Sequence, residues 1–346
     1  MSVEPAAPPR SPIAALFPGS FALVMATGIV SIAALQQRLE TIADVLFWLN
    51  AAFYVALWGL TILRVARYPR FALDDLKTHQ RGAGFLTIVA GTNVLGSQIV
   101  LLTTWTGLAF ALWILGIVGW LGLTYAFLTA VTVSDTKPGL AEGIGGVWLL
   151  LVVSTESIGV LGALLAPSVD ATEGVLLIAL LAHLVGLMLY LLVIGLIFYR
   201  WTFFPLRGEQ VTPPYWINMG ALAITTVGGA TLISASESWS VLEGLEPFLS
   251  GTTILAWGFA TWWIPLLIAV GVWKHGVQRV PIRYDPQYWS LVFPLGMYSV
   301  ATFRLGAGID LGIPAWIATT AFWVALAAWA VTAVGLVASA RAVVRR

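Results

Sequence analysis

The chain has 346 residues, of which 59% are apolar and only 10% are charged. Soluble globular proteins carry about 25% charged residues, so this composition excludes a soluble globular enzyme and a disordered protein. The net charge is +1 and Cys is absent, which excludes a strongly basic nucleic-acid-binding surface, disulfides and thiolate metal sites.

Long apolar stretches recur along the chain after a Pro- and Ala-rich N-terminal tail, residues 1–12, which is expected to be disordered and carries no secretory signal. A membrane-spanning helix needs about 20 mostly apolar residues. Stretches of that length predict a single ten-helix transport domain over 13–341, followed by a short basic tail over 342–346. The spans are expected at about 13–35, 43–65, 82–102, 106–132, 144–166, 173–200, 214–234, 247–273, 287–308 and 314–340.

Basic residues gather on alternate connections between these spans and at the C-terminal end. They are Arg64, Arg67, Arg70, Lys77 and Arg81 after the second span, Arg200 and Arg207 after the sixth, Lys274, Arg279 and Arg283 after the eighth, and Arg341, Arg345 and Arg346 at the end. The opposite connections carry mainly Asp and Glu. Because positively charged connections stay in the cytoplasm, we expect a multi-pass protein of the cell (inner) membrane with both termini inside.

The odd-numbered and even-numbered spans differ in composition. The odd spans are rich in Gly, Ser, Thr, Asn and Gln, whereas the even spans carry most of the Trp side chains. Lipid tails favour bulky apolar side chains, and close helix packing or a wet path favours small and weakly polar ones. The pattern therefore predicts an all-α polytopic membrane protein of five helical hairpins, with an inner ring of odd helices around a central pore and an outer ring of even helices.

Small and weakly polar side chains repeat at helical spacing on the odd spans. Two interpretations stay open: the faces are seams of close helix packing, or they line a shared path for a small solute that sheds part of its water. The candidate residues along such a path are Thr27, Thr87, Gly91, Gly159, Thr225, Gly228, Val300 and Arg304.

Only two charged residues, Glu156 and Arg304, fall deep inside the spans. Charges at that depth are costly and usually serve function. Three interpretations stay open: an ion pair that joins the fifth and ninth spans, attraction of anions by Arg304 near the outer mouth, and a proton-coupling role for Glu156. His183 in the sixth span is expected to be a packed or interfacial histidine.

The spans show no nucleophile–base set and no cluster of metal ligands, so we expect neither an enzyme nor a cofactor or metal. An intramembrane enzyme is a less favoured alternative. A sensor or scaffold role is compatible with the composition, but the short connections leave no room for a partner domain.

Four segments resemble the tellurite-resistance/dicarboxylate-transporter family, which includes slow anion channels, tellurite-resistance proteins, malate permeases and sulfite pumps. They read FPGSFALVMATGIVS from residue 17, GFLTIVAGTNVLG from residue 84, VWLLLVVSTES from residue 147 and YWSLVFPLGMYSVAT from residue 288. The resemblance extends over nearly the whole chain.

The resemblance implies ten helices in five hairpins around a pseudo-five-fold pore, a homotrimer, and a Phe of the ninth helix that plugs the pore. The Phe-Pro step here is Phe293-Pro294, which makes Phe293 the gate candidate; the other interpretation is a packing Phe beside a helix kink. Glu156 departs from the largely uncharged pore walls of the channel members.

We therefore expect a membrane anion channel or permease that works within the lipid bilayer and passes a small inorganic or carboxylate anion, such as chloride, nitrate, sulfite, tellurite or a small carboxylate. The alternative is a proton-coupled transporter of C4-dicarboxylates or sulfite. No nucleic-acid partner is expected.

Overall fold

The computed structural model describes residues 11–309 and 311–344, and within these ranges it consists of helices and connecting turns without a strand. Residues 1–10 of the N-terminal tail expected at 1–12 lie outside the described residues. Of the C-terminal tail expected at 342–346, residues 342–344 form the end of the last helix, and 345–346 lie outside the described residues. The all-helical architecture confirms the expected fold class of a polytopic α-helical membrane protein.

Five shorter helices form the centre of the bundle. They are α1 (Ala22–Gln36), α4 (Thr87–Leu102), α7 (Leu150–Leu165), α9 (Ile217–Ser234) and α11 (Trp289–Gly308). Each follows a short 3-10 turn: Pro18–Phe21, Gly82–Leu86, Gly146–Leu149, Pro213–Trp216 and Pro286–Tyr288. Three of these turns begin with Pro, whose fixed φ and missing N–H suit the first turn of a helix.

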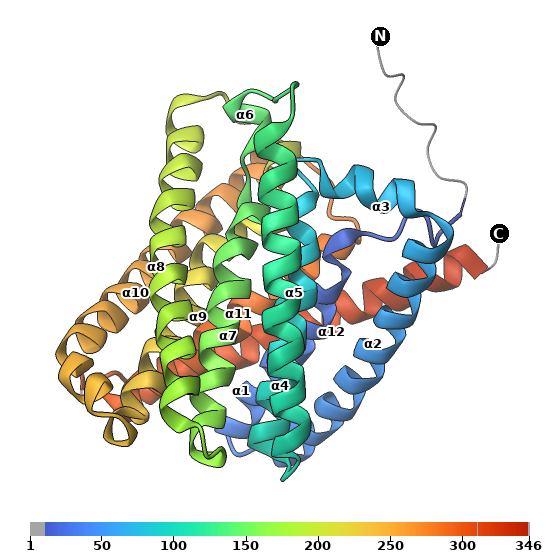
Figure 1. Ribbon diagram of the computed structural model, residues 1–346. Coiled ribbons are helices and arrows are strands. Elements are labelled where there is room, and N and C mark those ends of the chain that lie inside the picture. Colours follow the sequence, from blue (N-terminus) through green and yellow to red (C-terminus); the bar gives the residue numbers. More distant parts are fainter. Residues whose placement is uncertain (1–10, 310, 345–346) are drawn as a thin grey trace.

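Five longer helices surround them. They are α2 (Glu40–Arg67), α5 (Thr106–Val133), α8 (Thr172–Phe203), α10 (Ser240–Val272) and α12 (Ala315–Val344). The short helices α3 (Pro69–Leu76) and α6 (Leu140–Gly143) lie on the connections from α2 to α4 and from α5 to α7. In Figure 1, α7, α9 and α11 lie in the middle of the bundle and α2 and α10 at its two sides.

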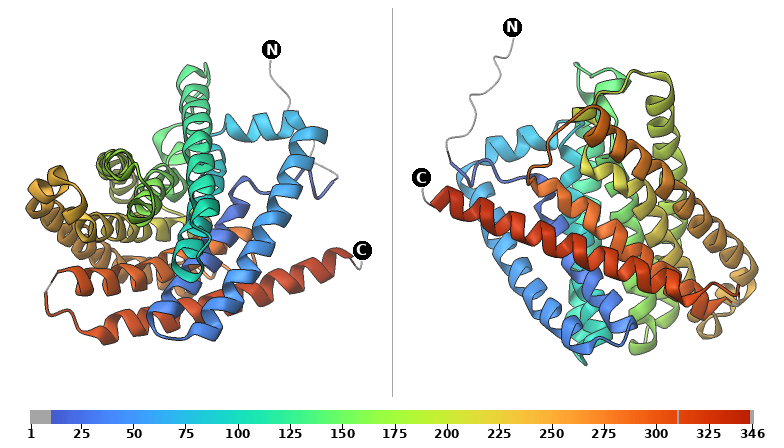
Figure 2. Two further views of the ribbon diagram at one scale, coloured as in Figure 1. Left: turned by 60° about the horizontal axis from the view of Figure 1, so that its bottom comes forward. Right: turned by 180° about the vertical axis from the view of Figure 1, so that it is seen from behind.

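The contacts between the inner helices close on themselves. α1 packs against α4, α4 against α7, α7 against α9, α9 against α11, and α11 against α1. Each outer helix packs on the inner helix that precedes it in the chain, which gives five helical pairs. Figure 2 shows the last of these pairs, in which α12 lies across the outside of the bundle over α11.

Burial separates the two groups of helices. Between 78% and 94% of the residues are buried in the spans built on α1, α4, α7 and α9, compared with 17% to 39% in the five outer helices. Trp48, Trp262 and Trp316 are exposed on the outer helices, where lipid would meet them. The difference in composition between odd and even spans therefore reflects the difference between bundle interior and lipid-facing surface.

Nine of the described helices are long and apolar enough to cross a membrane. Among the five inner and five outer helices, the one that does not meet this measure is α11, which has 20 residues and includes Pro294, Arg304 and several hydroxyl side chains. Since α11 is packed between α1 and α9, its lower hydropathy fits a helix that meets protein rather than lipid. The count of ten crossings stays a prediction.

Candidate functional site

Two cavities lie at opposite ends of the five inner helices. The first, here called the C-end cavity, measures about 30 Å³ and is lined by residues from the middle and the C-terminal part of all five helices. This volume is enough for roughly one or two water molecules. Its wall is mainly branched apolar: Ile32, Val94, Val160, Val227 and Val300 contribute one side chain from each inner helix.

The second cavity, here called the N-end cavity, measures about 570 Å³. It lies where the inner helices begin, and its lining includes Phe17, Arg81, Gly146, Tyr215 and Gln287, one residue from the start of each inner helix. The N-terminus of a helix carries a partial positive charge and free N–H groups. Five such ends around one cavity contribute positive potential to it.

Phe293 lies on α11 between the levels of the two cavities and lines neither of them. Met297, Val300 and Arg304 follow it on α11 and all line the C-end cavity. At about 100° per residue, these positions and Phe293 fall within roughly 60° of one another around the helix. Phe293 therefore continues the stripe of α11 that lines the C-end cavity, one turn closer to the N-end cavity, and its side chain is only 1% exposed.

Two close approaches hold α11 in this rotation. A Cβ on Gly220 of α9 would lie 2.6 Å from Pro294, and a Cβ on Gly296 would lie 2.7 Å from Ile29 of α1. Pro294 faces α9 and Gly296 faces α1. Around α11, the direction of Phe293 falls between these two, so its side chain points toward the axis of the bundle.

Arg304 lies near the C-terminal end of α11, on the wall of the C-end cavity, and is partly buried. It forms no ion pair with any of the described residues. The structure thus does not form the Glu156–Arg304 pair that was one interpretation of the intramembrane charges.

Glu156 instead belongs to a buried cluster that joins α7, α8 and α9. Its Oε2 lies 3.0 Å from Nδ1 of His183, and the hydroxyl of Thr225 donates to its Oε1 at 3.1 Å. Gly186 and Gly228 leave room for the carboxylate, since a Cβ at either position would lie within 2.9 Å of Glu156. Glu156 points away from the C-end cavity, although its neighbour Ser157 lines that cavity.

The structure places Val300 and Arg304 on the C-end cavity, and none of the other candidate path residues lines that cavity. The hydroxyl of Thr27 accepts a hydrogen bond from Trp329 of α12 at 3.0 Å. Gly91 approaches the carbonyl of Phe21, and Gly159 that of Ala179.

The remaining candidates do not line the C-end cavity either. Thr87 donates to the Gly84 carbonyl at 2.8 Å, within the turn that begins its own helix, and Thr225 and Gly228 adjoin Glu156. Most of the candidate path residues therefore make helix contacts or local hydrogen bonds, and aliphatic side chains form most of the wall of the C-end cavity.

Two polar features were missed by sequence reasoning. His183 is 1% exposed and pairs with Glu156, so it is more than a packing residue; a titratable side chain inside an apolar span was the available signal. The amide of Asn93 donates to the Ser157 hydroxyl at 2.9 Å, and both residues line the C-end cavity. No spacing in the sequence links these two positions.

A family model and two of three relatives match nearly the whole chain. A family model described as "Voltage-dependent anion channel" matches residues 16–337. A protein of Mycobacterium tuberculosis named "Uncharacterized membrane protein" is 43% identical over 150 residues, which is 43% of this chain and 75% of that protein. Two proteins of Methanocaldococcus jannaschii named "Uncharacterized transporter" are each 24% identical, over 319 and 325 residues, and the matches cover at least 90% of this chain and of each relative.

Proposed function

The chain belongs to the voltage-dependent anion channel family, and from this membership we propose that it is a channel or permease that passes small anions along the axis of its five inner helices, with Phe293 as the gate. The membership confirms the family resemblance seen in the sequence. The family is one of channels and transporters rather than of enzymes.

One observation carries the proposal. Side chains from all five inner helices line the C-end cavity, the starts of the same five helices surround the N-end cavity, and Phe293 lies between the two on the stripe that faces the axis. A solute that moves along the axis has to pass the Phe293 ring. In the predicted orientation, the N-end cavity opens toward the cytoplasm.

The chemistry of the path favours anions that lose water at modest cost. Helix N-termini at one end and Arg304 at the other supply positive potential. The narrow part between them is mainly apolar, so a passing anion loses hydrogen bonds to water without replacing all of them. Chloride, nitrate, sulfite, tellurite and small carboxylates are the solutes we propose.

The gate is tested by replacing Phe293 with Ala and measuring anion flux into proteoliposomes. We expect Phe293→Ala to raise the flux because it removes the ring from the axis. Phe303→Ala is the matched control, since Phe303 lies on the same helix but is 40% exposed on its outer side. Unchanged flux in a well-expressed, folded Phe293→Ala protein would remove Phe293 from this role.

A second candidate function is proton-coupled transport of a dicarboxylate or sulfite. The buried Glu156–His183 pair favours this candidate, because the pair places two titratable groups in the membrane region. Glu156 directly precedes Ser157, which lines the C-end cavity. A flux that depends on a pH gradient separates this candidate from a channel.

The homotrimer implied by the family resemblance is also part of the proposal. Native mass spectrometry of the detergent-purified protein tests it, with a trimer as the expected species. A monomer at all detergent and protein concentrations would contradict it.

A further inference from the structure

Arg200, in the last turn of α8, lines the N-end cavity although it is only 4% exposed. Its Nε donates to the Ala141 carbonyl at 2.7 Å, and its guanidinium lies 5.9 Å from the centre of the Tyr215 ring. Its Nη1 is buried without a hydrogen-bond partner among the described residues. A buried guanidinium with an unused donor is costly unless a further acceptor, such as an anion, takes up that donor.

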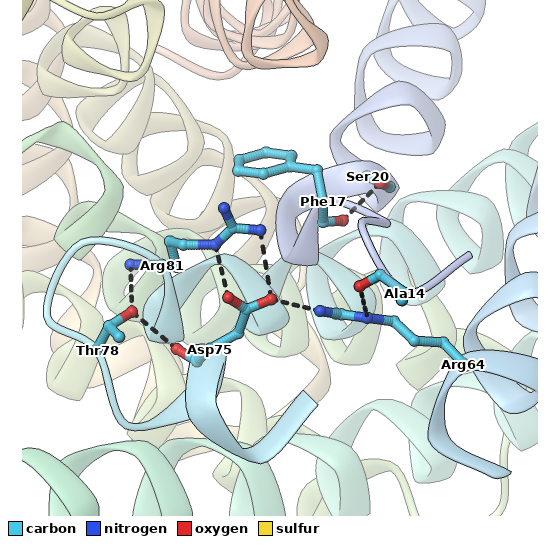
Figure 3. A network of polar contacts seen from close by, with 7 residues as sticks. All are labelled: Ala14, Phe17, Ser20, Arg64, Asp75, Thr78 and Arg81. Atoms are coloured by element: carbon cyan, nitrogen blue, oxygen red, sulfur yellow. Dashed lines mark hydrogen bonds and ion pairs between the residues drawn. The ribbon is translucent and has the colours of Figure 1, made fainter. Parts of the chain in front are cut away.

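Arg81 lines the same cavity and is held in place by its neighbours. Its Nε lies 2.8 Å from Asp75, which also pairs with Arg64, and its guanidinium lies 5.9 Å from the centre of the Phe17 ring. Figure 3 shows Asp75 between the two arginines. The single carboxylate of Asp75 thus pairs with two guanidinium groups, so this cluster of three residues has a net positive charge beside the cavity.

The carboxylates on the cavity wall do not neutralise these arginines. Glu142 is exposed at the rim, and Asp285 accepts from the backbone N–H of Gln287 at 2.8 Å. Neither forms an ion pair with Arg81 or Arg200. Burial and, to a lesser extent, the Lys137 charge lower the pKa of the nearby His79, which disfavours its charged form.

We propose that the N-end cavity holds a binding site for a small oxyanion or carboxylate, with Arg200 as the main ligand and Arg81 as a second cation. This inference rests on the proposed function, because the site lies at one end of the proposed path. A guanidinium presents two parallel N–H groups that match two oxygens of one anion, which a halide ion does not offer. The site should therefore prefer acetate or nitrate to chloride.

Equilibrium binding to the purified full-length chain in nanodiscs tests the site. The readout is the shift of the thermal unfolding midpoint on titration with acetate, nitrate or chloride at equal ionic strength. We expect saturable shifts for acetate and nitrate at lower concentrations than for chloride. Since a hydrogen bond to a charged group contributes about 1.5–3 kcal/mol, Arg200→Gln should weaken acetate binding about tenfold or more.

Two further variants keep the test decisive. Arg200→Lys retains the charge but loses the paired donors, so it should lose the preference for acetate over chloride even if Arg200→Gln does not fold. Arg70→Gln, at an exposed arginine away from the cavity, is the matched control and should bind as the unaltered chain does. Unaltered acetate preference in Arg200→Lys, or equal binding of acetate and chloride by the unaltered chain, would overturn the proposal.

Binding and flux separate this site from the proposed function. If Phe293→Ala raises anion flux but the Arg200 variants bind acetate normally, the site is wrong and the path stands. If the Arg200 variants lose binding but Phe293→Ala leaves the flux unchanged, the site stands and the gated path is wrong.

Discussion

The side chains that contact Glu156 differ from the partner that the sequence suggested. From the sequence, its one counterpart inside the spans was Arg304, because both are fully charged groups at membrane depth. In the structure its partners are His183 and Thr225, on the two helices next to α7. The rotation of α7 decides which partner is reached, and that rotation depends on packing across the whole bundle.

The first prediction at this scale concerns Glu156→Gln. Because the carboxylate faces away from the C-end cavity, a channel should keep its anion flux in Glu156→Gln liposomes without a pH gradient. His183→Gln should behave in the same way. Flux assays with and without a pH gradient check this; uptake that needs the gradient and is lost in Glu156→Gln would favour the proton-coupled alternative.

The second prediction concerns the space around the carboxylate. In Gly228→Ala the new Cβ would meet Glu156 at 2.9 Å and His183 at 3.1 Å. Crowding of this kind costs about 1–3 kcal/mol, so the thermal unfolding midpoint should fall. Gly258→Ala on α10 is the matched control, since nothing lies within 4 Å of its Cβ position, and an equal fall there would contradict the packing explanation.

At the scale of helices, α11 is the element on which the proposed path depends most. It is the inner helix with the most polar sequence pattern and it carries Phe293, Arg304 and the Pro294 contact with α9. Its rotation brings Phe293, Met297 and Val300 to the same side. Substitutions at the contacts of α11 should therefore alter anion flux, even where the substituted residue touches no residue of either cavity.

Gly220→Ala tests this dependence. The new Cβ would lie 2.6 Å from Pro294 Cγ and 3.0 Å from its Cα, and a backbone atom cannot move without moving the helix. We expect a loss of about 1–3 kcal/mol in stability together with a changed flux, measured by thermal unfolding and liposome assays. Gly195→Ala on α8, where the Cβ position is open, should change neither.

Helix positions were predictable from hydropathy, but helix ends and faces were less so. The eighth span was predicted from residue 247, whereas α10 begins at Ser240 and includes Pro247, since membrane helices tolerate an internal Pro. Stripes of Gly and Thr identified the inner helices correctly. They did not identify the side that faces the axis, because small residues serve close packing as well as they serve a path.

At the scale of the whole molecule, the difference in composition between alternate spans anticipated which helices are interior. The inner helices are largely buried and the outer helices expose Trp and aliphatic side chains. The two cavities were not predictable, because the C-end cavity is assembled from residues on five separate helices and the N-end cavity mainly from the separate turns and connections that precede them. Arg200 was read only as a charge that orients the chain, since its burial depends on the packing of α8 against the α6 connection.

The most direct test of the path uses single cysteines, because the natural chain has none. In the Phe293→Ala background, Val227→Cys and Val300→Cys place a thiol on the wall of the C-end cavity, and Val334→Cys places one on the 70% exposed lipid side of α12. An anionic methanethiosulfonate reagent should block anion flux in the first two variants and leave the third unchanged. If the reagent blocked anion flux only in Val334→Cys and did not react with the thiols in the cavity, this result would contradict a path enclosed by the inner helices.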